Sequence, residues 1–189
     1  MVWLEYSIEA TMSYINQINP EASSGDLARL YAEIAKRRGR VANFYKLLSL
    51  DDELAAANRD MYWASMLTIK GLSKLEREAM AAAVSISNEC AYCMVHHVEA
   101  LRKAGGSENL IERLEAGEEP EDQPERVVRL VYYARKLTLL PGSAGKQDIE
   151  DLREVGLTDY EIMQAVQIIG YYNYANRLAN GLGVELEDE

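Results

Sequence analysis

Apolar side chains recur at intervals of three and four residues along almost the whole chain, which is the spacing of one face of an α-helix. One such stripe comprises Leu27, Leu30, Tyr31 and Ile34. No convincing run of alternating β-branched residues competes with this pattern, and four prolines and twelve glycines leave long stretches uninterrupted. The sequence therefore predicts an all-α fold of about eight helices. We expect a single helical domain over residues 20–189 and an irregular N-terminal arm, carrying Trp3 and Tyr6, over residues 1–19.

The composition and charge restrict which partners the chain can have. A length of 189 residues suits one domain, and 48% apolar residues are enough for a hydrophobic core. The net charge of −11 repels nucleic acids and anionic membranes, so neither is an expected partner. No stretch approaches the roughly 20 apolar residues of a membrane helix, and the N-terminus lacks the basic lead of a secretory signal. We therefore expect a cytoplasmic protein.

Several helix ends are marked by residues that satisfy free backbone groups. Two capping boxes, Ser73 to Glu76 and Thr158 to Glu161, predict the first turns of two helices. Pro20 is predicted to begin the first helix and Gly39 to end it, while Ser49 and Asn88 are predicted to cap two others. The expected helical segments are 20–39, 41–49, 51–69, 73–87, 89–103, 107–116, 125–140, 146–156 and 160–183.

The segment NECAYCMVHH, residues 88–97, contains both cysteines and both histidines of the chain. Because Cys90 and Cys93 are three residues apart, a helix places their sulfurs on one face, close enough for a disulfide. Cys90 is expected in the first turn, where free N–H groups and the helix dipole lower the pKa of a thiol. At about 100° per residue, His97 lies angularly between the two sulfurs and can take a proton from either, directly or through a water.

A histidine that acts as a base usually has a carboxylate to orient it, and the preceding helix offers Glu78. The inward face of that helix is defined by Leu75, Ala79, Ala82 and Ile86. Glu78 lies at the edge of this face, so its carboxylate is expected either to be half-buried with a partner or to extend to water. Glu76 and Arg77 are predicted to point away. The connection between the two helices is very short, so they should pack side by side and bring Glu78 to His97 or to a thiol.

The residues alone leave several interpretations of this cluster open. The helix dipole favours Cys90 as the attacking sulfur, whereas the contact with His97 at i+4 favours Cys93. In a reducing compartment the pair is more often redox-active or metal-binding than a structural disulfide. A zinc site could use both cysteines with His97 or His96, and its fourth ligand would be Glu78, water or a neighbouring chain. An inert buried pair is the remaining alternative.

The motif Glu78-x11-Cys90-x2-Cys93-x3-His97 resembles the core of the alkylhydroperoxidase AhpD, within the carboxymuconolactone decarboxylase-like superfamily. The segments LSKLEREAMAAAVSISNECAYC and YYNYANRLANGLGVE resemble its peroxidase-related branch, and the resemblance covers roughly residues 20–185. It implies an AhpD-like helical fold. It also implies that Cys93 meets the peroxide and that Cys90 resolves the sulfenic acid as a disulfide. The residues matching Glu78 and His97 form the proton relay of the family.

Other residues near the motif are candidates for smaller roles. Tyr92 stands between the cysteines, where the best-studied pattern of the family has a histidine, and His96 lies beside the cysteine stripe. We regard both as candidate accessory residues. Side chains of the closing segment are interpreted as core, interface and structural hydrogen-bonding residues, namely Tyr171, Tyr172, Tyr174, Asn176 and Arg177.

These observations predict an oxidoreductase that acts on a peroxide, or a disulfide reductase, with catalytic residues Cys93, Cys90, His97 and Glu78. The predicted chemistry needs no organic cofactor and no metal. The resemblance implies a dithiol reductant, lipoyl or thioredoxin-like, and a symmetric homo-oligomer, a trimer or a hexamer. The alternatives are a redox-responsive binding module without turnover and a metal-binding Cys/His site. A decarboxylase or lactone-handling activity is disfavoured because that branch of the superfamily is not built around this dithiol.

Overall fold

The computed structural model describes residues 13–68 and 70–187. Within these two ranges the chain forms helices and contains no strand, which confirms the predicted all-α class. The α-helices are α1 (Gly25–Arg38), α2 (Asn43–Leu47), α3 (Asp52–Tyr62), α4 (Lys74–Ser87), α5 (Ala91–Lys103), α6 (Glu108–Ala116), α7 (Glu125–Leu139), α8 (Lys146–Glu154) and α9 (Asp159–Leu182). Three short helical turns accompany them, η1 (Pro20–Ala22), η2 (Trp63–Leu67) and η3 (Pro141–Ser143).

The described residues divide into two compact units. Unit 1 contains residues 13–59 and 180–187, and unit 2 contains the residues from 60 to 179. Residues 13–19 are not helical. Residues 1–12, and with them Trp3 and Tyr6, lie outside the described residues, so the predicted arm boundary stays a prediction.

Unit 1 follows the predicted pattern in its first helix, with two corrections. α1 buries Leu27, Leu30, Tyr31 and Ile34. It ends where the N–H of Gly39, at φ +85°, donates to the Ala35 carbonyl at 2.8 Å. Pro20 begins η1 and not α1, because Ser24 is extended and separates the two segments. Ser49 does not cap α3: its hydroxyl accepts from the Ile18 N–H at 2.8 Å, while Asp51 accepts from the Leu54 N–H.

The predicted helix over 51–69 is shorter and changes its geometry near its end. α3 stops at Tyr62, and η2 continues as one π-helical turn, closed by the Thr68 N–H on the Trp63 carbonyl at 2.9 Å. A π-turn adds a residue to the hydrogen-bonded loop and therefore shifts the faces of the residues that follow.

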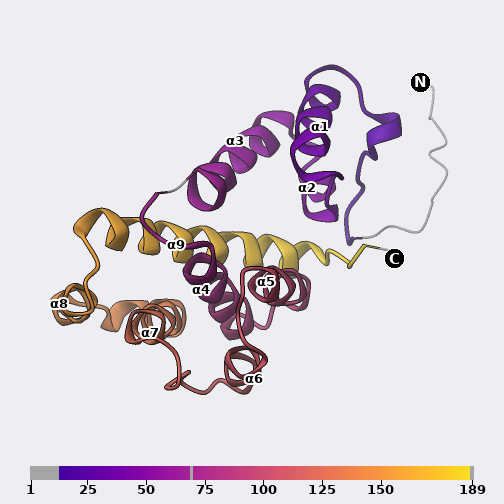
Figure 1. The fold of residues 1–189 in the computed structure, drawn as a ribbon. Helices are drawn as coiled ribbons and strands as arrows, with labels where there is room; N and C mark the ends of the chain where they lie inside the picture. Colours follow the sequence, from indigo (N-terminus) through magenta and orange to yellow (C-terminus); the bar gives the residue numbers. More distant parts are fainter. Residues whose placement is uncertain (1–12, 69, 188–189) are drawn as a thin grey trace, which may run out of the picture. The chain divides into compact units, whose positions relative to one another are not determined.

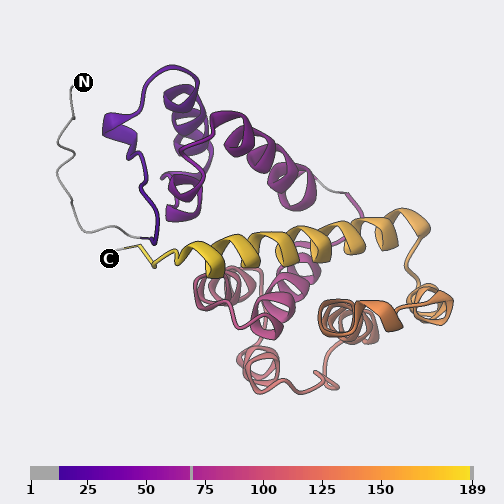
Figure 2. The ribbon, with the colours of Figure 1, turned by 180° about the vertical axis from the view of Figure 1, so that it is seen from behind.

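Unit 2 is organised around α4. The six residues from Ala79 to Val84 are at most 1% exposed, and four of them are alanines. Because alanine is small, neighbouring helices can approach α4 closely on every side. α4 contacts α5, α6 and α7, and its last turn is hydrogen-bonded to α9 through Ser85 and Asn176. Figures 1 and 2 show, from opposite sides, α4 and α5 lying next to the long helix α9.

Both predicted capping boxes are present in unit 2. The Ser73 hydroxyl accepts from the Glu76 N–H at 3.2 Å, and the Glu76 carboxylate accepts from the Ser73 N–H at 2.7 Å. Thr158 and Glu161 make the same reciprocal bonds at 3.3 Å and 2.8 Å. The first turns of α4 and α9 are thereby fixed by local sequence.

The prediction that Glu76 points away from the core is wrong. Glu76 is 7% exposed and bonds the guanidinium of Arg126 on α7. Arg126 also donates to the Glu161 carboxylate at 2.6 Å. A helical wheel assumes one buried face, whereas α4 is covered by other helices on a second side as well. The charged side chain is therefore buried together with its partner.

We predict that Arg126→Met lowers the free energy of unfolding by about 2 kcal/mol, the usual size for lost hydrogen bonds to charged groups. Hydrogen bonds from the Thr158 backbone and from Arg126 lower the pKa of Glu161 from 4.5 to about 2. A depressed carboxyl pKa stabilises the fold above pH 4.5, and this contribution is lost as the pH falls toward 2. The difference between wild type and variant in urea unfolding should therefore shrink over that range.

The matched control is Arg129→Met on the same helix. Arg129 is half exposed and lies 3.8 Å from Glu125, a separation at which surface ion pairs contribute little. Equal losses of stability in the two variants at neutral pH would contradict a structural role for the Arg126 network.

Candidate active site

The connection between α4 and α5 consists of the three residues from Asn88 to Cys90. Glu89 has φ +52°, in the left-handed region that glycine usually occupies, and its N–H donates to the Ile86 carbonyl at 3.0 Å. One left-handed residue reverses the chain at once, so α5 runs back along α4. The predicted side-by-side packing of the two helices is confirmed.

Two predicted positions within this connection are corrected. Asn88 does not cap α5: it ends α4, and its side-chain amide donates to Asn176 at 3.0 Å and to Asn173 at 3.2 Å. Cys90 is not in the first turn but is the N-cap of α5, where its carbonyl accepts the first helical bond from the Met94 N–H. Cys93 is the third residue of the helix. Glu89 and Cys90 were expected in the helix over 89–103, but they form the chain reversal, so α5 begins at Ala91.

Both cysteines are buried and reduced in this structure. Cys90 is fully buried, and Cys93 is 5% exposed. A hydrogen bond donated by the Cys93 thiol lowers the pKa of Cys90 to about 7, against the effect of burial. The backbone N–H of Cys93 and the side chain of Asn176 lower this pKa further. The pKa of Cys93 is raised, first because its proton is shared with Cys90 and second because it is buried. The pair therefore favours one shared proton, with the negative charge on Cys90.

Glu78 and His97 are in direct contact. The His97 Nδ1 atom lies 2.9 Å from the Glu78 Oε2 atom, and the two side chains are 12% and 11% exposed. Of the two expectations for Glu78, half-buried with a partner or extended to water, the structure has the first. A carboxylate on Nδ1 fixes the orientation of the ring and leaves Nε2 for other contacts. The role of this pair in proton transfer stays a prediction.

His97 is not hydrogen-bonded to either sulfur in the part of the chain that the structure describes. Its ring instead stands edge-to-face on the ring of Tyr172, with centroids 4.2 Å apart. Proton exchange between His97 and a thiol therefore requires a bridging water or a small movement of the ring.

The two candidate accessory residues contact each other. The rings of Tyr92 and His96 are in edge-to-face contact with centroids 4.4 Å apart, and Tyr92 is 7% exposed. This contact fits the packing role expected for Tyr92. An accessory function for either residue stays a prediction.

Helix α9 places two residues beside the site: Tyr172, which the sequence predicted to be a core or interface residue, and Asn176, which it predicted to be a structural hydrogen-bonding residue. Asn176 is fully buried, donates to the Ser85 hydroxyl at 3.3 Å and lowers the pKa of both thiols through hydrogen bonding. Tyr172 lies one turn earlier on the same face, against His97. The i to i+4 spacing of two polar side chains in a very apolar helix is the signal that could have identified them.

Residues 52–129 match the model of the carboxymuconolactone decarboxylase family. This segment contains Glu78, Cys90, Cys93 and His97. The similarity to this family therefore covers less than half of the chain. The family resemblance expected from the sequence is thereby confirmed.

Two similar solved structures are described as peroxidase-related proteins. A crystal structure from Ralstonia eutropha, described as an alkylhydroperoxidase AhpD core and uncharacterized peroxidase-related protein, is 27% identical, with a TM-score of 0.85 and 95% of both chains covered. A peroxidase-related protein from Silicibacter sp. is also 27% identical, with a TM-score of 0.82 and coverage of 96% of this chain and 95% of that one.

A Mycobacterium tuberculosis protein named alkyl hydroperoxide reductase is 33% identical over 100 residues. The aligned part is 50% of this chain but only 28% of that relative. The AhpD-like fold of the domain is therefore established, whereas the activity of that longer relative extends to this chain only as a proposal.

Among residues 13–68 and 70–187, no group of three or more His, Cys, Asp and Glu side chains is placed to hold a metal ion. In the same residues no helix is long and apolar enough to cross a membrane.

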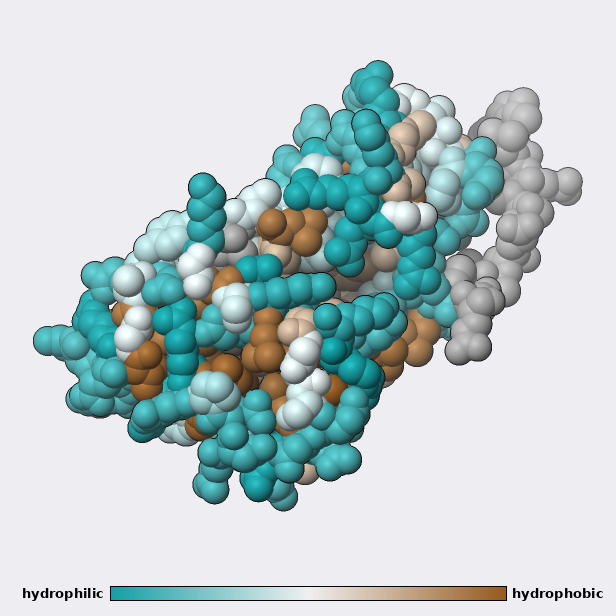
Figure 3. Space-filling model, in the orientation of Figure 1, coloured by the Kyte–Doolittle hydropathy of each residue, from teal (hydrophilic) through white to brown (hydrophobic). Residues whose placement is uncertain are grey.

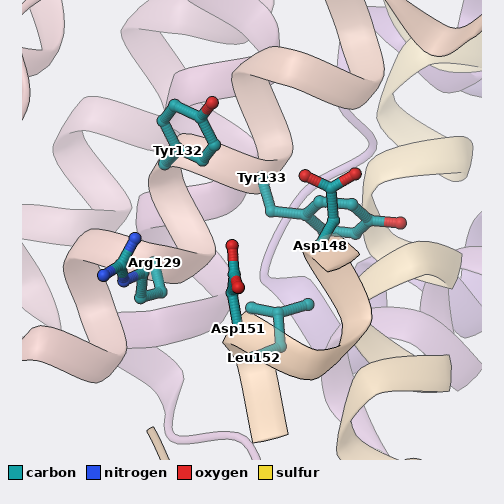
Figure 4. A pocket seen from close by; sticks show the side chains of 6 residues that line it. All are labelled: Arg129, Tyr132, Tyr133, Asp148, Asp151 and Leu152. Carbon is teal, nitrogen blue, oxygen red and sulfur yellow. The ribbon is translucent and has the colours of Figure 1, made fainter. Parts of the chain in front are cut away.

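Two surface hollows of unit 2 lie apart from the dithiol. Figure 4 shows the smaller one, of about 10 Å³, where Asp148, Asp151 and Leu152 of α8 face Arg129, Tyr132 and Tyr133 of α7. This volume suits at most one water. The larger groove, of about 320 Å³, is lined by Met94, Val95, Val98, Glu99, Arg102 and Glu115. Neither cysteine lines either hollow, and the burial of both cysteines makes the candidate site a closed one.

We predict that Asn176→Ala raises the pKa of Cys90 above its value of about 7, because the thiolate loses a hydrogen-bond donor. The measurement is the pH dependence of the ultraviolet thiolate absorbance of the reduced protein. Asn173→Ala is the matched control, since Asn173 donates to Thr138 and the Ile169 carbonyl and not to sulfur. If both variants titrate like the wild type, Asn176 does not stabilise the thiolate.

Proposed function

We propose that the chain is a thiol-dependent peroxidase of the AhpD-like type. The observation that carries this proposal is a buried, reduced Cys90–Cys93 pair on the helix that brings His97 into contact with Glu78. Such a site supplies a nucleophilic sulfur, a second sulfur to resolve the product and a group that can carry a proton. The names of the Mycobacterium, Ralstonia and Silicibacter relatives support the same class of reaction.

The first step is attack on a peroxide by Cys93, the cysteine of the pair that retains some exposure. The proton that the pair shares moves to Cys90, so that Cys93 reacts as the thiolate, while His97, as the imidazolium that Glu78 stabilises, faces the leaving oxygen. The thiolate attacks one peroxide oxygen, an S–O bond forms and the O–O bond breaks. The sulfur is oxidised to a sulfenic acid, and the leaving alkoxide takes the proton from His97 to give an alcohol.

The second step is attack by Cys90 on the sulfenic sulfur. The Cys90 proton passes to His97, and the Cys93 N–H and Asn176 stabilise the thiolate that attacks. A disulfide forms and hydroxide leaves, to be protonated to water. The sum is the reduction of one peroxide to an alcohol and water by two thiols. An external dithiol, lipoyl or thioredoxin-like, then reduces the disulfide by exchange.

A homo-oligomer, a trimer or a hexamer, is part of the proposal by family resemblance. Exposed apolar side chains along one face of α9 support it, namely Tyr160, Met163, Val166 and Tyr174, which are 37–55% exposed. Figure 3 shows apolar patches among the hydrophilic side chains on one face of the molecule. Apolar patches rimmed by polar groups are typical of association surfaces.

A redox-responsive module without turnover is the second candidate. The burial of both sulfurs favours it, because a closed site admits an external dithiol slowly. The two candidates differ in whether the disulfide is reduced repeatedly during the reaction.

The test is a steady-state assay with tert-butyl hydroperoxide and a dithiol reductant. We expect multiple turnovers for the wild type and loss of turnover in Cys93→Ser and Cys90→Ser. We also expect a dimedone adduct on Cys93 in the Cys90→Ser variant, because its sulfenic acid cannot be resolved. One stoichiometric oxidation without turnover would support the module instead. If dimedone instead labels Cys90 in the Cys93→Ser variant and does not label Cys93 in the Cys90→Ser variant, Cys90 is the cysteine that attacks the peroxide.

We further predict that Glu78→Gln lowers kcat by about 10²-fold, as expected for loss of a group that supports acid–base catalysis. Glu76→Gln is the matched control, because Glu76 is an equally buried carboxylate on the same helix that bonds Arg126 and not His97. It should lower the free energy of unfolding and leave kcat near the wild-type value. Equal losses of kcat in both variants would mean that the effect comes from stability.

A further inference from the structure

The hydroxyl of Tyr172 is buried and has no hydrogen-bond partner among residues 13–68 and 70–187. The side chain is 3% exposed. A buried donor without a partner costs the folded state free energy, and natural proteins keep few of them. Such a group in a candidate active site is explained when a ligand supplies the partner during function.

The position of Tyr172 connects it with the reacting groups. Its ring meets the ring of His97 edge-to-face, with centroids 4.2 Å apart and an interplanar angle of 77°. Tyr172 lies four residues before Asn176 on α9, so both face the dithiol. The Asn176 side chain hydrogen-bonds the sulfurs, whereas the Tyr172 hydroxyl makes no hydrogen bond within the described residues.

We propose that the Tyr172 hydroxyl is a catalytic group that hydrogen-bonds the leaving oxygen of the peroxide. This inference rests on the proposed function and adds the residue that recognises the O–O bond. As the S–O bond forms and the O–O bond breaks, the bonding electron pair of the O–O bond stays on the leaving oxygen. The phenol stabilises that charge, and the alkoxide then takes its proton from His97.

The electrostatics of the site keep the phenol available as a donor. Burial raises the pKa of Tyr172 well above its usual value, and the charges of Tyr62 and Glu78 raise it further. The hydroxyl therefore stays protonated throughout the pH range in which Cys90 becomes a thiolate.

Tyr172→Phe tests the inference, because it removes one oxygen atom and keeps the ring against His97. Three quantities are measured: the single-turnover rate of oxidation of the reduced protein by tert-butyl hydroperoxide, the rate of reduction of the oxidised protein by dithiothreitol, and the urea midpoint. We expect the first to fall about 10²-fold, the loss typical of one oxyanion donor. The second should change less than about twofold because no O–O bond breaks. The midpoint should stay or rise, since the lost hydroxyl had no partner.

Tyr132→Phe is the matched control, an exposed tyrosine on α7, and all three quantities should stay at their wild-type values. An unchanged peroxide rate in Tyr172→Phe, an equal fall in both rates, or a clear fall in the midpoint would each overturn the inference. If the wild-type thiols themselves resist the peroxide, the proposed function fails together with this inference. If the wild type and Tyr172→Phe are oxidised by the peroxide at the same rate, the inference about Tyr172 fails and the proposed function stands.

Discussion

The three-residue reversal between α4 and α5 is the constraint on which the candidate site depends. With Glu89 in a left-handed conformation, α5 begins immediately after α4 and runs back along it. The reversal places Cys90 at the N-cap and Cys93 in the first turn. It also sets His97, two turns into α5, against Glu78 on α4. A longer connection would leave the spacing of these groups free to vary, and the Glu78–His97 contact would no longer follow from local geometry.

Burial then determines the chemistry of the pair. Two thiols that are withdrawn from water cannot both ionise, because their charges would repel each other in a medium of low dielectric constant. One proton is therefore shared, and the N-cap position with the Cys93 N–H and Asn176 stabilises the charge on Cys90. Glu78 bonds His97 in the same part of the molecule, where the two side chains are largely buried. Closure of the site strengthens each of these interactions and also limits access to the sulfurs.

Much of the fold could be predicted because its signals are local. The capping boxes at Ser73 and Thr158 and the left-handed Gly39 act over three or four residues, so their helix ends are present as predicted. Ser49 and Asn88 were misassigned because their side chains bond distant groups, Ile18 and Asn176. The residues next to Ser49 and Asn88 in the sequence give no indication of those distant partners. Glu76 was misplaced for the same reason, since Arg126 is fifty residues away.

The sequence by itself determined the helical class and the four residues of the motif that carries the family resemblance, because periodicity and spacing are properties of neighbouring residues. Tertiary structure alone decided that Glu78 is paired with His97, that the charge of the dithiol favours Cys90, and that Tyr172 and Asn176 of α9 lie against His97 and the dithiol. Those features depend on burial and on contacts between helices that are distant in the chain. Free energies of desolvation and pairing arise only when such helices come together.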